Sequence, residues 1–181
     1  MRKRKLKEQN PTEGGWVPDS NFSPLDLARE YALALKRRFG RDLVSVVVYG
    51  SSARNDYKRT SDIDLIVVVE NLPPSLNERL RLLGEIEDEL QPIVDSLHRR
   101  GIHTCFSTRL RTPDEARRFV PIYLDMTEDA VFLHDENGFF QGVLAEVRAR
   151  LGELGARRVR RGRLCYWELK PDFKWGEVIE L

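Results

Sequence analysis

Two aspartates separated by a single residue, Asp62 and Asp64, stand where an apolar run begins. Alternate side chains of a strand share a face, so both carboxylates would point to one side of a sheet while Ile63 points to the other. Two like charges this close repel each other, and keeping both ionised requires a compensating cation. Paired carboxylates suit Mg²⁺, which prefers oxygen ligands and keeps waters and substrate phosphates in its other positions. The spacing therefore predicts a divalent-metal site suited to phosphoryl transfer.

A glycine and a serine, Gly50 and Ser51, follow an earlier apolar run at residues 43–49 and begin the connection to the aspartates. A glycine lets the backbone approach a phosphate closely, and the serine hydroxyl adds a donor beside the amides of a short helix expected at residues 52–54. The N-terminus of a helix favours anions. The two groups thus make complementary demands on one ligand, with a metal at the carboxylates and a triphosphate at the turn.

Residues 50–69 read GSSARNDYKRTSDIDLIVVV. This stretch resembles the signature of the DNA polymerase β-like nucleotidyltransferase superfamily: a hydrophobic strand, Gly-Ser, a short connection, and Asp-x-Asp in the next strand. It is most similar to the small stand-alone members, the minimal nucleotidyltransferases, which usually read Gly-Ser-x-Ala-Arg-Gly and Ser-Asp-Ile-Asp-Leu. The joint pattern is specific, whereas either half alone would carry little weight. The order of expected elements agrees with the superfamily over residues 24–110.

The resemblance implies a role for each matching residue. Asp62 and Asp64 would be the catalytic metal ligands, with Mg²⁺ or Mn²⁺ as the ion and an NTP, expected to be ATP, as the substrate. The residues that would bind the nucleotide are Gly50, Ser51, Arg54 and Ser61. For Arg54, a surface position on the short helix is an equally good interpretation.

The sequence departs from the family pattern at two places. Asn55 replaces a glycine, which is tolerable in a left-handed conformation because asparagine visits that region more readily than most residues. Active members also carry a third carboxylate on the strand after the long helix, as metal ligand and base, but residues 102–110 contain no Asp or Glu. His103 or Ser107 could face the site without replacing a carboxylate. The acidic residues that follow, each a segment too late, are Asp125, Glu128 and Asp135. Nucleotide binding is therefore better supported than turnover.

The surrounding elements predict an α/β (α+β) fold, a nucleotidyltransferase-like mixed β-sheet with helices packed mainly on one face. Hydrophobic periodicity places strands at residues 43–49, 63–69, 102–110 and 130–134, with one more in the C-terminal part. Helices are expected at residues 24–39, 75–101, 116–126 and 143–154. Pro92 is expected to kink or divide the second of these helices.

The length of 181 residues and the balance of 41% hydrophobic and 33% charged residues indicate one soluble globular domain. We expect a flexible basic arm at residues 1–20 and a nucleotidyltransferase domain at 21–135. A helix, strand and tail at 136–181 would extend that domain. No apolar run approaches the ~18 residues that span a bilayer, so a cytoplasmic protein that does not enter the membrane is expected. Cys105 and Cys165 are predicted to be buried free thiols.

The C-terminal part combines aromatic residues with a cluster of arginines at residues 157–163. The aromatic residues are interpreted as packing onto the core rather than as a platform for stacked bases; they are Tyr166, Trp167, Phe173 and Trp175. The arginines are compatible with phosphate or RNA contact, and equally with a solvated helix end. A nucleic-acid partner is therefore not favoured.

The leading hypothesis is a Mg²⁺-dependent nucleotidyltransferase that directs an acceptor hydroxyl at the α-phosphorus of an NTP and expels pyrophosphate. The resemblance implies a helical toxin-like protein partner in a toxin-antitoxin system, with a hydroxyl of that partner as the acceptor. The competing hypothesis is a nucleotide-binding or protein-interaction module that is catalytically weak or inactive because it lacks the third carboxylate. Whether the protein forms a homo-oligomer is left open.

Overall fold

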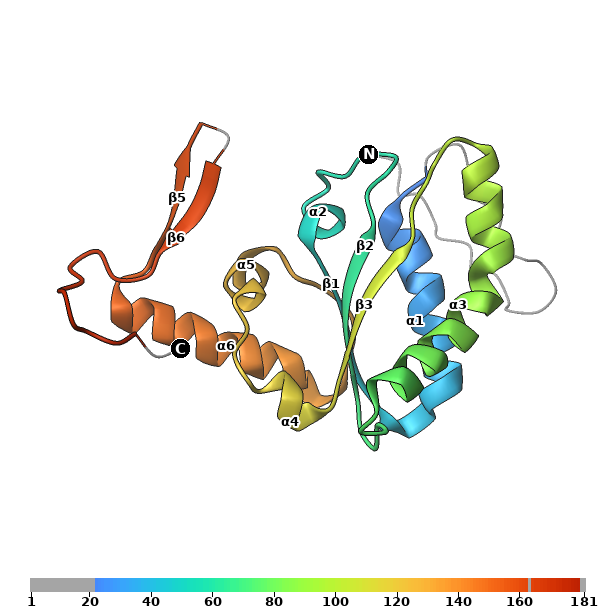
Figure 1. Ribbon diagram of the computed structural model, residues 1–181, viewed down its shortest axis with the longest axis horizontal. Coiled ribbons are helices and arrows are strands. Elements are labelled where there is room, and N and C mark those ends of the chain that lie inside the picture. The colour runs from blue at the N-terminus through green and yellow to red at the C-terminus, as the bar shows by residue number, and fades with distance from the viewer. Residues whose placement is uncertain (1–21, 163, 180–181) are drawn as a thin grey trace, which may run out of the picture.

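A four-stranded mixed sheet forms the centre of the protein (Figure 1), whose computed structural model describes residues 22–162 and 164–179. The expected arm at residues 1–20 lies outside these residues. The strands stand in the order β3-β2-β1-β4, with β2 and β3 parallel and the other neighbours antiparallel. Their bounds are β1 (Leu43–Tyr49), β2 (Ile63–Val69), β3 (Phe106–Arg111) and β4 (Val131–Asp135). The predicted mixed α/β sheet is confirmed.

The two central strands are buried on both sides, which explains why their apolar runs are continuous rather than alternating. One face of the sheet, including Val46 and Val48, packs against α1 (Pro24–Phe39) and α3 (Leu76–Arg99). Gly40–Asp42 forms a short 3-10 helix, η1, between α1 and β1. α3 continues as one helix through Pro92.

The opposite face of the sheet, including Val47 and Val68, packs against the helices that follow β3 and β4. Figure 1 shows the sheet nearly edge-on, with α1 and α3 on one side and the later helices on the other. Helices therefore cover both faces, a wider distribution than the expected packing mainly on one face. The remaining helices are α2 (Gly50–Ala53), α4 (Pro113–Ala116), α5 (Ile122–Asp129), η2 (Glu136–Gly138) and α6 (Phe139–Leu154).

Two element boundaries differ from the sequence-based expectation. β3 begins at Phe106 rather than at residue 102, because the backbone of residues 102 and 103 bonds outside β2, to Leu97 and Arg59. The helix expected at residues 116–126 is divided, since α4 ends at Ala116 and α5 begins only at Ile122. Pro121 precedes α5, and its lack of an N–H is compatible with a helix start and not with a helix interior.

The C-terminal part forms a separate antiparallel hairpin of β5 (Arg157–Arg161) and β6 (Leu164–Glu168), which stands apart from the main sheet (Figure 1). One strand was predicted here and two are found. The arginines at residues 157–161 lie on β5 rather than at a helix end. Trp167 is partly buried against the core, as expected. The expected packing is wrong for the other three aromatic residues, Tyr166, Phe173 and Trp175, which are exposed.

Neither cysteine is buried in the way the sequence predicted. Cys105 and Cys165 are free thiols, but both are exposed. Within residues 22–162 and 164–179, no helix combines the length and the apolar character needed to cross a membrane.

Candidate functional site

The two aspartates lie where β2 begins, and Asp64 shares a face of the sheet with Ile66 and Val68, which pack against α4, α5 and α6. Asp64 pairs with Tyr49 of β1 and, on the other side, with Ser107 of β3. Asp62 precedes the strand and is exposed, and the Sγ of Cys105 donates a hydrogen bond to its Oδ1 at 3.0 Å. The site-facing residues of three adjacent strands therefore meet at this end of the sheet.

The turn between β1 and α2 packs directly against Asp64. Gly50 has φ of +73°, and a Cβ added to it would lie 2.6 Å from Asp64 Oδ2. Only a residue without a side chain fits both the left-handed backbone and this approach. Ser52, which is buried, donates its hydroxyl to the carbonyl of Asp62 at 3.3 Å. The turn and the carboxylate pair are thus held together by contact and by a hydrogen bond.

The structure gives Asp64 an environment that disfavours its charge. Burial is the main cause of its raised pKa, and the neighbouring carboxylate of Asp62 adds to it. A hydrogen bond from Ser107 and the positive charges of Arg109 and Arg54 oppose the shift in part. A cation beside both carboxylates would relieve the penalty, so the donor set fits a hard divalent ion.

The expected nucleotide-binding residues divide into two groups. Gly50, Ser51 and Arg54 lie together at α2, and Arg54 extends toward α5, where its Nη1 is 3.6 Å from Asp129 Oδ2. Ser61 lies in the connection, and its hydroxyl accepts a hydrogen bond from the Lys58 backbone N–H at 2.9 Å. The Ser61 hydroxyl therefore stabilises the turn at residues 58–61.

The backbone conformation of Asn55 agrees with the expectation from the family pattern. Its φ is +56°, in the left-handed region where the family has glycine. The substitution of Asn for Gly is thus compatible with the turn.

The strand expected to carry a third carboxylate carries Ser107 opposite Asp64. Of the two residues considered as substitutes, Ser107 faces the site, whereas His103 is exposed and lies before β3 with its ring near His98. Among residues 22–162 and 164–179, no three Asp, Glu, His or Cys side chains are grouped so that they could hold a metal. Within these residues, the carboxylate donors of this site are therefore Asp62, just before β2, and Asp64 on it.

The three later acidic residues belong to other parts of the molecule. Asp135 accepts hydrogen bonds from the Ser45 hydroxyl and from the backbone N–H groups of Phe140 and Gln141 in the first turn of α6. Asp125 bonds to Trp167 and Arg158 of the hairpin. Glu128 lines a hollow of about 560 Å³ between α5, β4 and α6.

Sequence reasoning missed Arg109 and the position of Cys105. The Nε of Arg109 donates to the Tyr49 hydroxyl at 3.1 Å, and Arg109 lines a hollow of about 360 Å³ together with Ile66 and Tyr123. Although Cys105 is exposed overall, partial burial of its thiol, together with the hydrogen bond to Asp62 and the charge of that carboxylate, raises the pKa of Cys105 to about 11. The available signal was strand alternation, which puts residues 105, 107 and 109 on the face of Asp64 once the parallel register is known.

Comparison with known proteins identifies the family. The sequence model of the nucleotidyltransferase domain matches residues 28–119. Two proteins of Methanocaldococcus jannaschii named "Putative protein adenylyltransferase" are similar to this chain. One is 26% identical over 121 residues, covering 66% of this chain and 77% of the relative. The other is 40% identical over 63 residues, covering 35% and 67%. The crystal structure of a toxin-antitoxin with AMP-PNP superposes with a TM-score of 0.45 at 14% identity, covering 70% of this chain and 92% of that one.

The contact between Gly50 and Asp64 predicts the effect of adding one methyl group. Gly50→Ala should lower the free energy of unfolding by about 1–3 kcal/mol, because alanine is strained at positive φ and the Asp64 carboxylate must move. Denaturant unfolding measures this change. Gly84→Ala in α3, where an added Cβ meets nothing within 4 Å, is the control and should stabilise by about 0.5–1 kcal/mol. Equal stability of Gly50→Ala and wild type would contradict the contact.

The raised pKa of Asp64 predicts a pH-dependent gain in stability when its charge is removed. The protonated form stabilises the fold, and this contribution is complete below the pKa of an unfolded aspartate, about 3.9. It is lost as pH rises through the higher folded value. Asp64→Asn should therefore unfold at a higher temperature than wild type near pH 7, and the gain should shrink as pH falls toward 4.

The matched control for this measurement is Asp56→Asn, which changes an exposed aspartate in the same connection. Its unfolding temperature relative to wild type should not rise between pH 4 and pH 7. A gain for Asp64→Asn that stays constant between the two pH values would rule out the unfavourable carboxylate as its source.

Proposed function

Because the chain belongs to the nucleotidyltransferase family, we propose that it transfers a nucleoside monophosphate from an NTP to a hydroxyl of a protein acceptor. The observation that supports this most directly is the approach of Gly50 to Asp64, where an added Cβ would lie 2.6 Å from Oδ2. It brings the turn suited to phosphates against the carboxylates suited to a metal. One ligand carrying both a triphosphate and a divalent ion would satisfy both groups.

In this proposal Asp62 and Asp64 hold Mg²⁺ or Mn²⁺. Both are oxygen donors at the start of β2, and the charge of Asp64 is disfavoured by burial and by Asp62. When bound, a divalent ion of this kind lowers the pKa of an attacking hydroxyl and neutralises charge on the leaving pyrophosphate. The two aspartates would supply the metal ligands, and the backbone at the start of β2 would fix the distance between their carboxylates.

The turn and two arginines would bind the nucleotide. Gly50 leaves the backbone open to a phosphate, and Ser51 offers a hydroxyl beside it. Arg54 and Arg109 place positive charge near Asp64, as their lowering effect on its pKa indicates. Both guanidinium groups can therefore offset part of the charge that a triphosphate brings to the site.

A protein acceptor and ATP are proposed from two sources. The similar proteins of Methanocaldococcus jannaschii carry the name "Putative protein adenylyltransferase". The superfamily that residues 50–69 resemble also includes members that act beside a helical toxin-like protein, which we propose as the kind of partner. We further propose that residues 21–135 form the nucleotidyltransferase domain and that 136–181 extend it, since α6 packs on the same sheet.

The proposal predicts metal-dependent labelling that requires both aspartates. The protein would be incubated with Mg²⁺ or Mn²⁺ and each labelled NTP, alone and with lysate proteins. Asp62→Ala and Asp64→Ala should each reduce label transfer at least about 100-fold, because a metal site with one carboxylate is left. Asp56→Ala, an exposed aspartate of the same connection, is the matched control and should transfer like wild type. Equal labelling by wild type and both variants would refute the mechanism.

A second function, nucleotide binding without efficient turnover, is favoured by one observation. Ser107 lies opposite Asp64 on β3, the strand on which active members carry a carboxylate that binds metal and serves as base, and residues 102–110 contain no Asp or Glu. In that case calorimetry would find metal-dependent NTP binding that needs Asp62 and Asp64, while the labelling experiment would find no transfer. Together the two measurements separate a transferase from a binding module.

Adding the third carboxylate tests the role of this position. Ser107→Asp places a third like charge beside Asp64, so without metal it should unfold at a lower temperature than Ser107→Asn, which has the same shape and no charge. Saturating Mn²⁺ should raise the unfolding temperature of Ser107→Asp more than that of wild type, because the ion gains a ligand. Equal Mn²⁺-induced shifts in wild type and both variants would show that residue 107 does not face the metal.

A further inference from the structure

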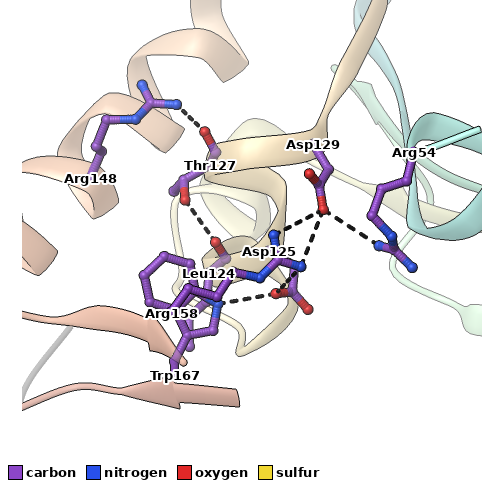
Figure 2. A network of polar contacts seen from close by, with 8 residues as sticks. All are labelled: Arg54, Leu124, Asp125, Thr127, Asp129, Arg148, Arg158 and Trp167. Carbon is purple, nitrogen blue, oxygen red and sulfur yellow. Dashed lines mark hydrogen bonds and ion pairs between the residues drawn. The ribbon is translucent and has the colours of Figure 1, made fainter. Parts of the chain in front are cut away.

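One carboxylate oxygen joins the proposed nucleotide site to the C-terminal hairpin. Asp129, at the end of α5, places its Oδ2 3.6 Å from Arg54 Nη1 of the α2 segment. The same oxygen lies 3.3 and 3.4 Å from Nη1 and Nη2 of Arg158 on β5. Figure 2 shows the two guanidinium groups approaching this carboxylate from opposite sides. Arg54 and Arg158 therefore share one acceptor.

The hairpin holds Arg158 in this position through a second aspartate of α5. Arg158 Nη2 is 3.4 Å from Asp125 Oδ1, and the Trp167 indole N–H donates to that oxygen at 3.0 Å. Arg158 and Trp167 are direct cross-strand partners, so they present one face of the hairpin to α5 (Figure 2). The hairpin and its contacts with Asp125 therefore hold the Arg158 side chain in place.

The charges in this network balance, and they are partly shielded from water. Two aspartates of α5 face two arginines, and the Asp129 side chain is only 18% exposed. Screening by salt is weaker at such a site than for exposed charges. If the Arg158 charge were absent, Asp129 would interact with Arg54 alone, and two aspartates would face a single arginine beside the triphosphate.

We propose that Arg158 is a positioning residue of the nucleotide site, which neutralises Asp129 and so leaves the guanidinium of Arg54 available to the triphosphate. This inference rests on the proposed function, in which Arg54 contacts the phosphates. It makes the C-terminal hairpin part of the site, although the hairpin lies far from Asp62 and Asp64 in the sequence. The proposed role of Arg158 leaves the metal-binding role of Asp62 and Asp64 as it is.

Affinity for ATP, measured by calorimetry with the full-length protein and Mg²⁺, tests this role. Arg158→Gln should weaken ATP binding about three- to tenfold, as expected for losing one partly buried charge interaction. Combining it with Asp129→Asn should restore most of the affinity, because the acidic group that Arg158 neutralises is then gone. Arg158→Lys, which keeps the charge, should bind nearly as well as wild type.

The matched control is Arg157→Gln on the same strand. Arg157 points to the other face of the hairpin, is largely exposed, and pairs with Glu168 of β6 at 2.6 Å. Its loss should leave ATP affinity unchanged. Thermal unfolding of each variant identifies any that loses its fold, and for an active enzyme Arg158→Gln should raise KM and leave kcat nearly constant.

The outcomes distinguish a failure of the proposed function from a failure of this inference. Absence of ATP binding by the wild type overturns the proposed function and this inference together. If the wild type binds ATP and Arg158→Gln binds it as well as Arg157→Gln does, the inference alone fails. A loss of affinity in Arg158→Gln that Asp129→Asn does not relieve also overturns it, because the effect then comes from the hairpin itself.

Discussion

The structure depends on keeping two like charges side by side where the buried strand β2 begins, against a turn that has no room for a side chain at Gly50. Asp64 is disfavoured as an anion by burial and by Asp62, and Gly50 fits against it only because it lacks a Cβ. Such an arrangement lowers the stability of the fold, and it persists only where the surrounding structure or the function maintains it. A ligand that carries both a cation and phosphates would supply the missing compensation, which is why this contact supports the functional proposal.

Much of this region could be predicted from the sequence because its determinants are local. The continuous apolar runs of β1 and β2 follow from burial on both faces, and the turn residues between them follow from close approach and left-handed backbone, as at Gly50 and Asn55. Both groups lie within one short segment of the chain. Strand alternation then suffices to place Asp62 and Asp64 on one side of the sheet.

The features that were not predicted depend on contacts between distant segments. Arg109 faces the site only because β3 pairs parallel to β2 in a register that the sequence does not specify. The division of α4 from α5, the second strand of the hairpin and the exposure of Cys105 also depend on tertiary packing. The shared oxygen of Asp129 joins three segments of the chain, and no local pattern marks it.

The hairpin has a consequence for the motions of the protein. A two-stranded sheet is marginal by itself in water, so β5 and β6 depend on their attachment to α5 for persistence. That attachment consists of a few polar contacts and the partly buried Trp167, whereas the main sheet is covered on both faces. The hairpin should therefore open locally at a lower free energy than the central strands, and its amide protons should exchange with solvent first.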